Sequence, residues 1–175
     1  MVESALWTVD ELVAATGGRL EGTVTAALNG VAIDSRSVSP GDIFVAIRGD
    51  RTDGHEYAAS ALAAGAGLTV VSRPDEAMRK AGPLLVVDDA LNALEQMGRS
   101  ARARVGGKVV AVTGSVGKTT TKDALKVALS ACGPTHAAVS SFNNHWGVPL
   151  TLARMPRASA FAVIEVGMNH AGEIE

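Results

Sequence analysis

Cysteine is nearly absent from this sequence, and its scarcity limits the kinds of site that the chain can form. The 175 residues include one cysteine, Cys132. A single cysteine excludes a disulfide within the chain and a cysteine-rich metal site. The four histidines show no spacing typical of zinc ligands. We therefore expect neither a disulfide-stabilised fold nor a structural zinc centre.

An excess of charge of one sign is also missing. Charged residues make up 19% of the chain and the net charge is −2, which gives no attraction to nucleic acid or to an anionic membrane. We interpret the basic run of Arg99, Arg102, Arg104 and Lys108 as the solvated face of a helix. These features predict that nucleic acid is not a partner.

Long hydrophobic runs are missing as well. No stretch approaches the roughly 18 consecutive apolar residues that suggest a transmembrane helix. The N-terminal segment Met-Val-Glu-Ser-Ala-Leu lacks the basic start and the apolar run of a signal peptide. We therefore expect a cytoplasmic protein without a transmembrane segment, and the sequence leaves its oligomeric state open.

What is present is a pattern of apolar strands that alternate with helices. Hydrophobic residues make up 47% of the chain, which suffices for a packed core. Thr8 and Glu11 form a capping-box pattern that predicts a first helix, and Gly17 and Gly18 end it. Strands are predicted at residues 31–33, 43–47, 68–72 and 84–87, and helices at residues 57–66 and 90–104. This alternation predicts an α/β fold.

A glycine pair, Gly106 and Gly107, marks a predicted domain boundary. Residues 1–106 would form a first unit and residues 107–175 a second. The second unit opens with an apolar run at 109–112, typical of a strand buried on both faces, and continues with a loop at 113–117 and a helix at 118–131. Another buried strand is predicted at 160–164. This order indicates the first part of a doubly wound parallel sheet.

The loop of the second unit has the composition of a phosphate-binding loop. Its glycines let backbone N–H groups turn toward an anion, and the following helix directs its positive end at the phosphates. Lys118 would reach the β- and γ-phosphates of ATP, and the Thr119 hydroxyl would bind Mg²⁺. Val112 stands where the general pattern has its first glycine, so only the Gly-x-x-Gly-Lys-Thr part matches. The predicted nucleotide-binding residues are Gly114, Ser115, Val116, Gly117, Lys118, Thr119 and Thr120.

A carboxylate that serves the metal ion is expected at the end of the second buried strand. Glu165 follows residues 160–164, and the carboxyl edge of a parallel sheet is where ligands bind. Glu165 would face the phosphates, directly on the ion or through a water molecule. Asp88 also ends an apolar run, but it precedes the loop. We therefore interpret Asp88 or Asp89 as the cap of the helix that follows.

Longer motifs indicate a family of ligases, and the GTPase motifs Asp-x-x-Gly and Asn-Lys-x-Asp do not occur after the loop. Residues 34–49 read Asp-Ser-Arg-Ser-Val-Ser-Pro-Gly-Asp-Ile-Phe-Val-Ala-Ile-Arg-Gly, and Asp-Gly-His follows at 53–55. The second unit contains Asn-Asn-His-Trp-Gly-Val-Pro at 143–149 and Glu-Val-Gly-Met-Asn-His at 165–170. With the phosphate loop, this ordered set resembles the Mur ligases of peptidoglycan synthesis from about residue 8 to the end. The last two motifs favour the type that adds D-alanyl-D-alanine to UDP-N-acetylmuramoyl-tripeptide.

The resemblance implies a reaction and its participants. ATP with Mg²⁺ would phosphorylate the terminal carboxylate of UDP-N-acetylmuramoyl-tripeptide, and the amine of D-alanyl-D-alanine would attack the acyl phosphate. Lys118 and Glu165 would be catalytic, with Thr119 and Glu165 at the metal. The uridine nucleotide would contact Ser35, Arg36, Asp53, Gly54 and His55. The peptide and phosphate region would contact Asn143, Asn144 and His170.

Two alternatives stay open from the sequence alone. One is a sister ligase of the MurE type, which acts on a different amine, and the other is a nucleotide-binding module without catalysis. Family members carry three domains, and residues 107–175 are too few to close a doubly wound sheet. We therefore expect this chain to be an incomplete and inactive fragment, without the family's modified lysine and its D-alanyl-D-alanine domain.

Overall fold

The computed structural model describes residues 5–49, 51–138 and 143–167. By their internal contacts the residues divide into two units, Met1–Met97 and Gly98–Glu175, so that the division falls within helix α4 (Ala90–Arg104). The boundary predicted at Gly106 and Gly107 lies just after this helix and stays a prediction. Within the described ranges, no helix is long and apolar enough to cross a membrane.

The first helix, α1 (Val9–Thr16), begins with the predicted capping box. The Thr8 hydroxyl accepts a hydrogen bond from the Glu11 backbone N–H at 3.2 Å, and the Glu11 carboxylate accepts one from the Thr8 N–H at 3.0 Å. Gly17 ends the helix in the left-handed region, with a φ of 68°. Leu12 is fully buried and anchors the helix to the first unit.

The first unit is built on a five-stranded sheet in the order β1-β5-β4-β3-β2. The strands are β1 (Arg19–Glu21), β2 (Gly30–Ala32), β3 (Asp42–Val45), β4 (Leu68–Val71) and β5 (Leu84–Val86). β2, β3, β4 and β5 run parallel, and β1 joins β5 antiparallel. Every residue of β4 is buried, as expected for a central parallel strand. The sheet confirms the predicted α/β class.

Short helices connect these strands. They are the 3₁₀ turns η1 (Ser35–Ser37) and η2 (Gly54–Tyr57) and the helices α2 (Ala58–Ala63) and α3 (Glu76–Ala81). The α2 residues Ala61 and Leu62 pack in one core with Phe44 and Met78. The helix predicted at 57–66 was too long, because its first residue belongs to η2 and its end meets Gly65, whose φ is 110°.

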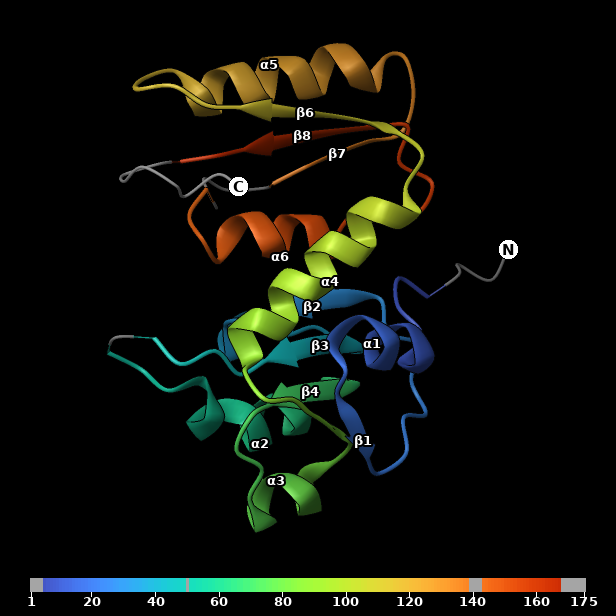
Figure 1. Cartoon of the computed structure of the whole chain (residues 1–175), viewed down its shortest axis with the longest axis vertical. Coiled ribbons are helices and arrows are strands. Elements are labelled where there is room, and N and C mark those ends of the chain that lie inside the picture. The colour runs from blue at the N-terminus through green and yellow to red at the C-terminus, as the bar shows by residue number, and fades with distance from the viewer. Residues whose placement is uncertain (1–4, 50, 139–142, 168–175) are drawn as a thin grey trace. The chain divides into compact units, whose positions relative to one another are not determined.

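The second unit holds three parallel strands in the order β6-β8-β7, between two helices (Figure 1). Helix α5 lies along one face, where its Leu125 and Leu129 pack with Val163. Helix α6 lies on the other face, where Leu152 packs with Ile164. Strand β7 was not predicted, because it has no apolar run. Helix α6 was not predicted either. The bounds are β6 (Lys108–Val112), α5 (Lys118–Ser130), β7 (Thr135–Ala137), α6 (Gly147–Ala153) and β8 (Phe161–Glu165).

Candidate active site

The predicted phosphate loop lies between β6 and α5, in the strand–loop–helix order that its chemistry requires. Gly114 and Gly117 adopt φ values of 148° and 76°, which favour glycine. Gly117 directly precedes α5. Its chain neighbours apart, no atom lies within 4 Å of the place that a Gly117 Cβ would take, so the space beside this residue is open. This is the backbone geometry expected of a phosphate cradle.

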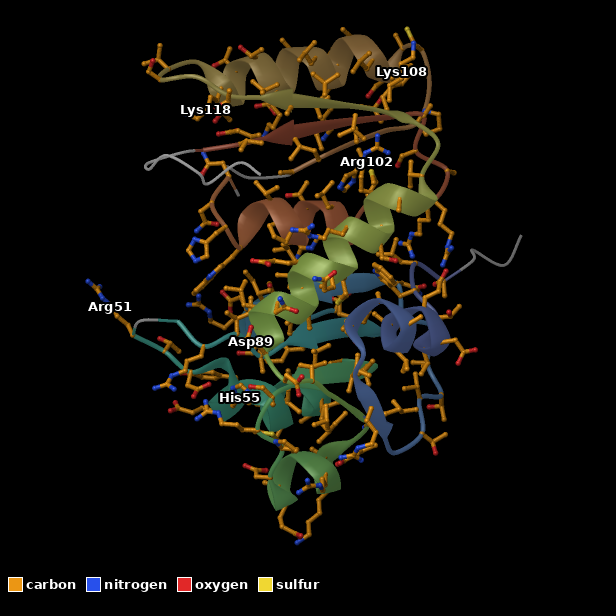
Figure 2. The ribbon with its side chains drawn as sticks, in the orientation of Figure 1. Arg51, His55, Asp89, Arg102, Lys108 and Lys118 are labelled. Atoms are coloured by element: carbon orange, nitrogen blue, oxygen red, sulfur yellow. The ribbon has the colours of Figure 1, made fainter. Side chains whose placement is uncertain are left out.

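Lys118 is the first residue of α5 and lies at the loop end of that helix (Figure 2). Its Nζ donates to the Gly114 carbonyl oxygen at 2.7 Å, and the contact is exposed to solvent. The ammonium is therefore already beside the loop backbone where a phosphate would be held. An exposed contact of this kind is readily exchanged for one to a phosphate oxygen, because the charge–charge attraction is the stronger interaction.

Glu165 is the centre of a hydrogen-bonded group at the carboxyl end of β8. It is 1% exposed. Thr119 Oγ1 donates to Glu165 Oε2 at 3.0 Å, and Asn143 Nδ2 donates to Glu165 Oε1 at 2.8 Å. Three segments far apart in the sequence therefore meet at one carboxylate, which lies at the strand end where ligands of parallel sheets bind. A buried carboxylate is stable only with such partners.

The backbone around Asn143 reinforces this arrangement. Gly167 N donates to the Asn143 carbonyl oxygen at 2.7 Å, and Val166 N donates to the Val112 carbonyl oxygen at 2.9 Å. A Cβ on Gly167 would lie 3.1 Å from the Asn143 Cγ, which leaves little room for any larger residue. The glycine in the motif at 165–170 is therefore explained by close packing against Asn143.

Asn144 has a different function from its neighbour. Its Oδ1 accepts from Gly147 N at 2.8 Å, and its backbone oxygen accepts from Val148 N at 3.0 Å, so that it holds the turn that leads into α6. The structure thus brings Asn143 to the carboxylate group and uses Asn144 in forming a helix. His170, also expected near the substrate, lies outside the described residues.

Lys122 is a buried cation that sequence reasoning missed. It is 1% exposed, and its Nζ donates to the Ala138 carbonyl oxygen at 3.1 Å and lies 3.2 Å from Asp123 Oδ1. The hydrogen bond to Ala138 joins α5 to the residue after β7. The available signal was its position one helical turn after Lys118, which places both side chains on the same side of α5.

The residues expected to contact the uridine nucleotide lie at the carboxyl edge of the first sheet. Ser35 and Arg36 form η1 just after β2, with Asp34 as its cap. The Arg36 guanidinium binds both carboxylate oxygens of Asp34, with Nη2 2.6 Å from Oδ2. This hydrogen-bonded guanidinium lowers the pKa of Asp34 to about 2. Carboxyl edges of parallel strands are ordinary ligand sites, so the location suits the prediction.

The same edge, after β3, also holds η2, which is capped by Asp53 and includes Gly54 and His55. Figure 2 labels His55. A Cβ on Gly54 would lie 2.6 Å from the Ile47 carbonyl oxygen, which explains the glycine. His55 is 8% exposed, and its ring contacts protein on both sides. His55 Nδ1 lies 2.7 Å from Asp53 Oδ1, and Nε2 accepts from the Ser72 backbone N–H at 3.0 Å. His55 is therefore engaged within the fold.

The Asp53–His55–Ser72 order is geometrically similar to a hydrolase triad. The Ser72 hydroxyl oxygen lies 3.1 Å from His55 Nε2. However, Nε2 also faces the backbone N–H groups of Ser72 and Arg73, at 3.0 and 3.3 Å. A general base needs a free lone pair for the nucleophile's proton, and here backbone donors already compete for it. We therefore interpret the group as structural.

The donor set beside the phosphate loop fits Mg²⁺ with ATP. Mg²⁺ prefers oxygen ligands and is held by one or two protein groups together with substrate phosphates and water. The Thr119 hydroxyl and the Glu165 carboxylate supply such oxygens. Across 5–49, 51–138 and 143–167, no three His, Cys, Asp or Glu side chains gather into a metal site, so a complete cage of protein ligands is not what this part of the chain offers.

Models of one protein family match both parts of the chain. The Mur ligase family, catalytic domain, matches residues 27–104, and the Mur ligase middle domain matches residues 112–175. The UDP-N-acetylmuramoyl-tripeptide–D-alanyl-D-alanine ligase of Escherichia coli strain K12 is 41% identical over 167 residues, which are 95% of this chain and 36% of that protein. The Bacillus subtilis strain 168 ligase of the same name is 37% identical, over 85% of this chain and 32% of that protein.

Solved structures give the same relationship. MurF from Acinetobacter baumannii superimposes with a TM-score of 0.84 at 38% identity, over 96% of this chain and 37% of that one. MurF ligase from Thermotoga maritima in complex with ADP gives 0.64 at 30% identity, over 79% and 32%. The chain thus spans about a third of the length of its relatives. Both of its units match consecutive parts of one family, and the chain belongs to the Mur ligase family.

Proposed function

We propose that this chain is the uridine-nucleotide unit and the phosphate-loop part of an ATP-dependent ligase of the MurF type. The complete protein would join D-alanyl-D-alanine to UDP-N-acetylmuramoyl-tripeptide, the reaction named for the relatives from Escherichia coli and Bacillus subtilis. A cytoplasmic location belongs to the same proposal. The observation that carries it is the buried Glu165 carboxylate, held by Thr119 and Asn143 beside the phosphate loop.

The chemistry explains why these groups would be needed. A carboxylate oxygen of the tripeptide attacks the γ-phosphorus of ATP, and ADP leaves with the electron pair of the broken P–O bond. The amine of D-alanyl-D-alanine then attacks the acyl carbon, loses a proton and displaces phosphate. The first step brings two anions together, so cations and N–H groups must offset their repulsion. Lys118 and the N-terminus of α5 are placed to do so.

Glu165 and Thr119 would hold the metal end of the same site. Bound Mg²⁺ would neutralise charge on the triphosphate. Thr119 would contribute its hydroxyl oxygen. Glu165 would accept a hydrogen bond from that hydroxyl and so orient its oxygen. Asn143 would keep the carboxylate in place by its bond to the other oxygen. The MurF structure from Thermotoga maritima was solved with ADP, which supports an adenine nucleotide here.

The binding half of the proposal is tested with the chain itself. Calorimetry with UDP-N-acetylmuramoyl-tripeptide and, separately, with ATP and Mg²⁺ measures the two expected sites. The proposal predicts saturable binding of the uridine nucleotide, and a nucleotide-binding module without catalysis predicts the same result. Amide formation by the complete ligase separates those two functions, because the binding module would form no product. A chain that binds no uridine nucleotide would contradict the assignment of the first unit.

The amine is tested with the complete ligase encoded by the source gene. D-Alanyl-D-alanine, meso-diaminopimelate and lysine are supplied in turn with ATP and the nucleotide tripeptide, and amide formation is followed by mass. The proposal predicts product with D-alanyl-D-alanine alone. If that dipeptide is inert and one of the amino acids reacts, the complete protein is instead a sister ligase of the MurE type.

A further inference from the structure

One arginine at the carboxyl edge of the first sheet was not singled out by any motif. Arg73 follows β4, one residue after Ser72, and its side chain is 57% exposed. Its guanidinium forms an ion pair with the Asp53 carboxylate through Nη2 and Oδ2. Its backbone N–H points at His55 Nε2, 3.3 Å away. Both the side chain and the backbone of Arg73 are therefore held by the Asp-Gly-His turn.

The hydrogen bonds of His55 determine where its proton lies. Nε2 accepts from the Ser72 backbone N–H at 3.0 Å, so this nitrogen carries a lone pair. The ring proton of the neutral imidazole is then on Nδ1, and it donates to Asp53 Oδ1 at 2.7 Å. Asp53 Oδ1 also accepts from the His55 backbone N–H at 3.1 Å. One carboxylate oxygen thus binds His55 and the other binds Arg73.

These contacts fix the position of the Arg73 guanidinium and leave some of its N–H donors available for a ligand. A guanidinium has five N–H donors, and Asp53 engages one of its nitrogens. His55, by contrast, is almost fully buried, with both ring nitrogens occupied inside the protein. Of the Asp-Gly-His turn and the arginine that it holds, Arg73 is the group that can reach a ligand in solvent. Phosphate oxygens are its best partners because they accept paired hydrogen bonds.

We propose that Arg73 binds the diphosphate of the uridine nucleotide, and that Asp53 and His55 act through Arg73 as positioning residues. This inference rests on the proposed function of the first unit. It changes how the Asp-Gly-His turn works, because the turn orients a cation and its histidine does not touch the nucleotide. Arg36, which also lies at this edge, is bound to both oxygens of its own aspartate.

The test measures binding of UDP, UMP and uridine to the whole chain by calorimetry. Arg73→Gln removes the charge and keeps much of the side chain's length. The expected result is a loss of at least tenfold in affinity for UDP, a smaller loss for UMP and none for uridine. Arg73→Lys is expected to restore part of the UDP affinity. A general structural defect would instead weaken all three ligands together.

The chain offers a matched control in Arg79→Gln. Arg79 Nε lies 2.9 Å from Glu21 Oε2, so it is also an exposed arginine bound to a carboxylate of the first unit. Glu21 pairs with Leu84 at the start of β5, away from the carboxyl edge. Arg79→Gln is therefore expected to leave UDP affinity unchanged. An equal loss for both variants would overturn the inference, since it would reflect net charge alone.

Positioning by Asp53 is tested by combining variants. Asp53→Asn is expected to lower UDP affinity in the wild-type background and to have little further effect in Arg73→Gln, because residues of one network are not additive. Additive losses would overturn the positioning function. If wild type binds UDP and Arg73→Gln binds it equally well, this inference fails and the proposed function stands. If wild type binds no uridine nucleotide, the proposed function fails as well.

Discussion

The Thr119 hydroxyl donates its hydrogen bond to the Glu165 carboxylate, with 3.0 Å between Oγ1 and Oε2, across a sequence separation of 46 residues. A hydroxyl has one proton and two lone pairs. Because the proton points at Glu165, the lone pairs point away from it. Glu165 would therefore orient Thr119 for a cation, as carboxylates hydrogen-bonded to metal ligands do.

Glu165→Gln should damage the metal end of the site and leave the fold intact. Glutamine has nearly the same shape, but it loses the charge and offers one acceptor oxygen where the carboxylate has two. We expect the activity of the complete ligase to fall on the order of 10–100-fold, the usual cost of losing such a partner, and the Mg²⁺ concentration for half-maximal activity to rise. Activity measured against Mg²⁺ at saturating ATP checks this. Unchanged Mg²⁺ dependence would contradict a function at the metal.

Lys118→Ala should remove transition-state stabilisation in the complete ligase. The ammonium lies beside the loop backbone, at the Gly114 carbonyl, and would neutralise charge that develops on the transferred phosphoryl group. We expect a loss on the order of 3 kcal/mol in kcat/KM, which is more than a hundredfold. Steady-state assays check this, with melting temperature as the control for folding. The contact is exposed, so we expect stability to change little.

The phosphate loop and the first helix could be predicted because their signals are local. Thr8 and Glu11 are three residues apart, and the loop needs only glycines beside a lysine and a threonine. The position of Glu165 followed from the rule for parallel strand ends. The contact of Asn143 with Glu165 and that of Arg73 with Asp53 were not predictable in this way, because each joins segments about 20 residues apart in the sequence.

Alanine substitutions at the neighbouring residues Asn143 and Asn144 should have different effects. Asn143→Ala removes a donor to the Glu165 carboxylate, so we expect a loss of activity on the order of tenfold or more with a modest change in stability. Asn144→Ala removes the side-chain hydrogen bond that holds the turn before α6, so we expect a stability loss of about 1 kcal/mol. Urea unfolding and turnover are measured on both variants. Equal effects of the two substitutions in both assays would contradict the separate functions assigned to them.

Asp53 should make part of the chain's stability dependent on pH. Burial alone would raise its pKa, but hydrogen bonds from His55 and Arg73 outweigh burial and bring the pKa from 3.8 to about 2. A carboxyl with a lowered pKa contributes stability that is fully present above its ordinary pKa and is lost as the pH falls through the folded value. The loss should therefore occur between about pH 4 and pH 2.

Asp53→Asn tests this pH dependence because the amide does not titrate. With solvent screening allowed for, the wild-type chain should lose about 1 kcal/mol more stability than the variant between pH 6 and pH 2. Urea unfolding of the two proteins at both pH values gives the difference. Asp34→Asn is the matched comparison, because the pKa of Asp34 is also about 2 but its side chain is 44% exposed. Its effect should be smaller, since water screens an exposed ion pair more strongly, and a larger effect at Asp34 would show that the Asp53–His55–Arg73 contacts do not hold the first unit together.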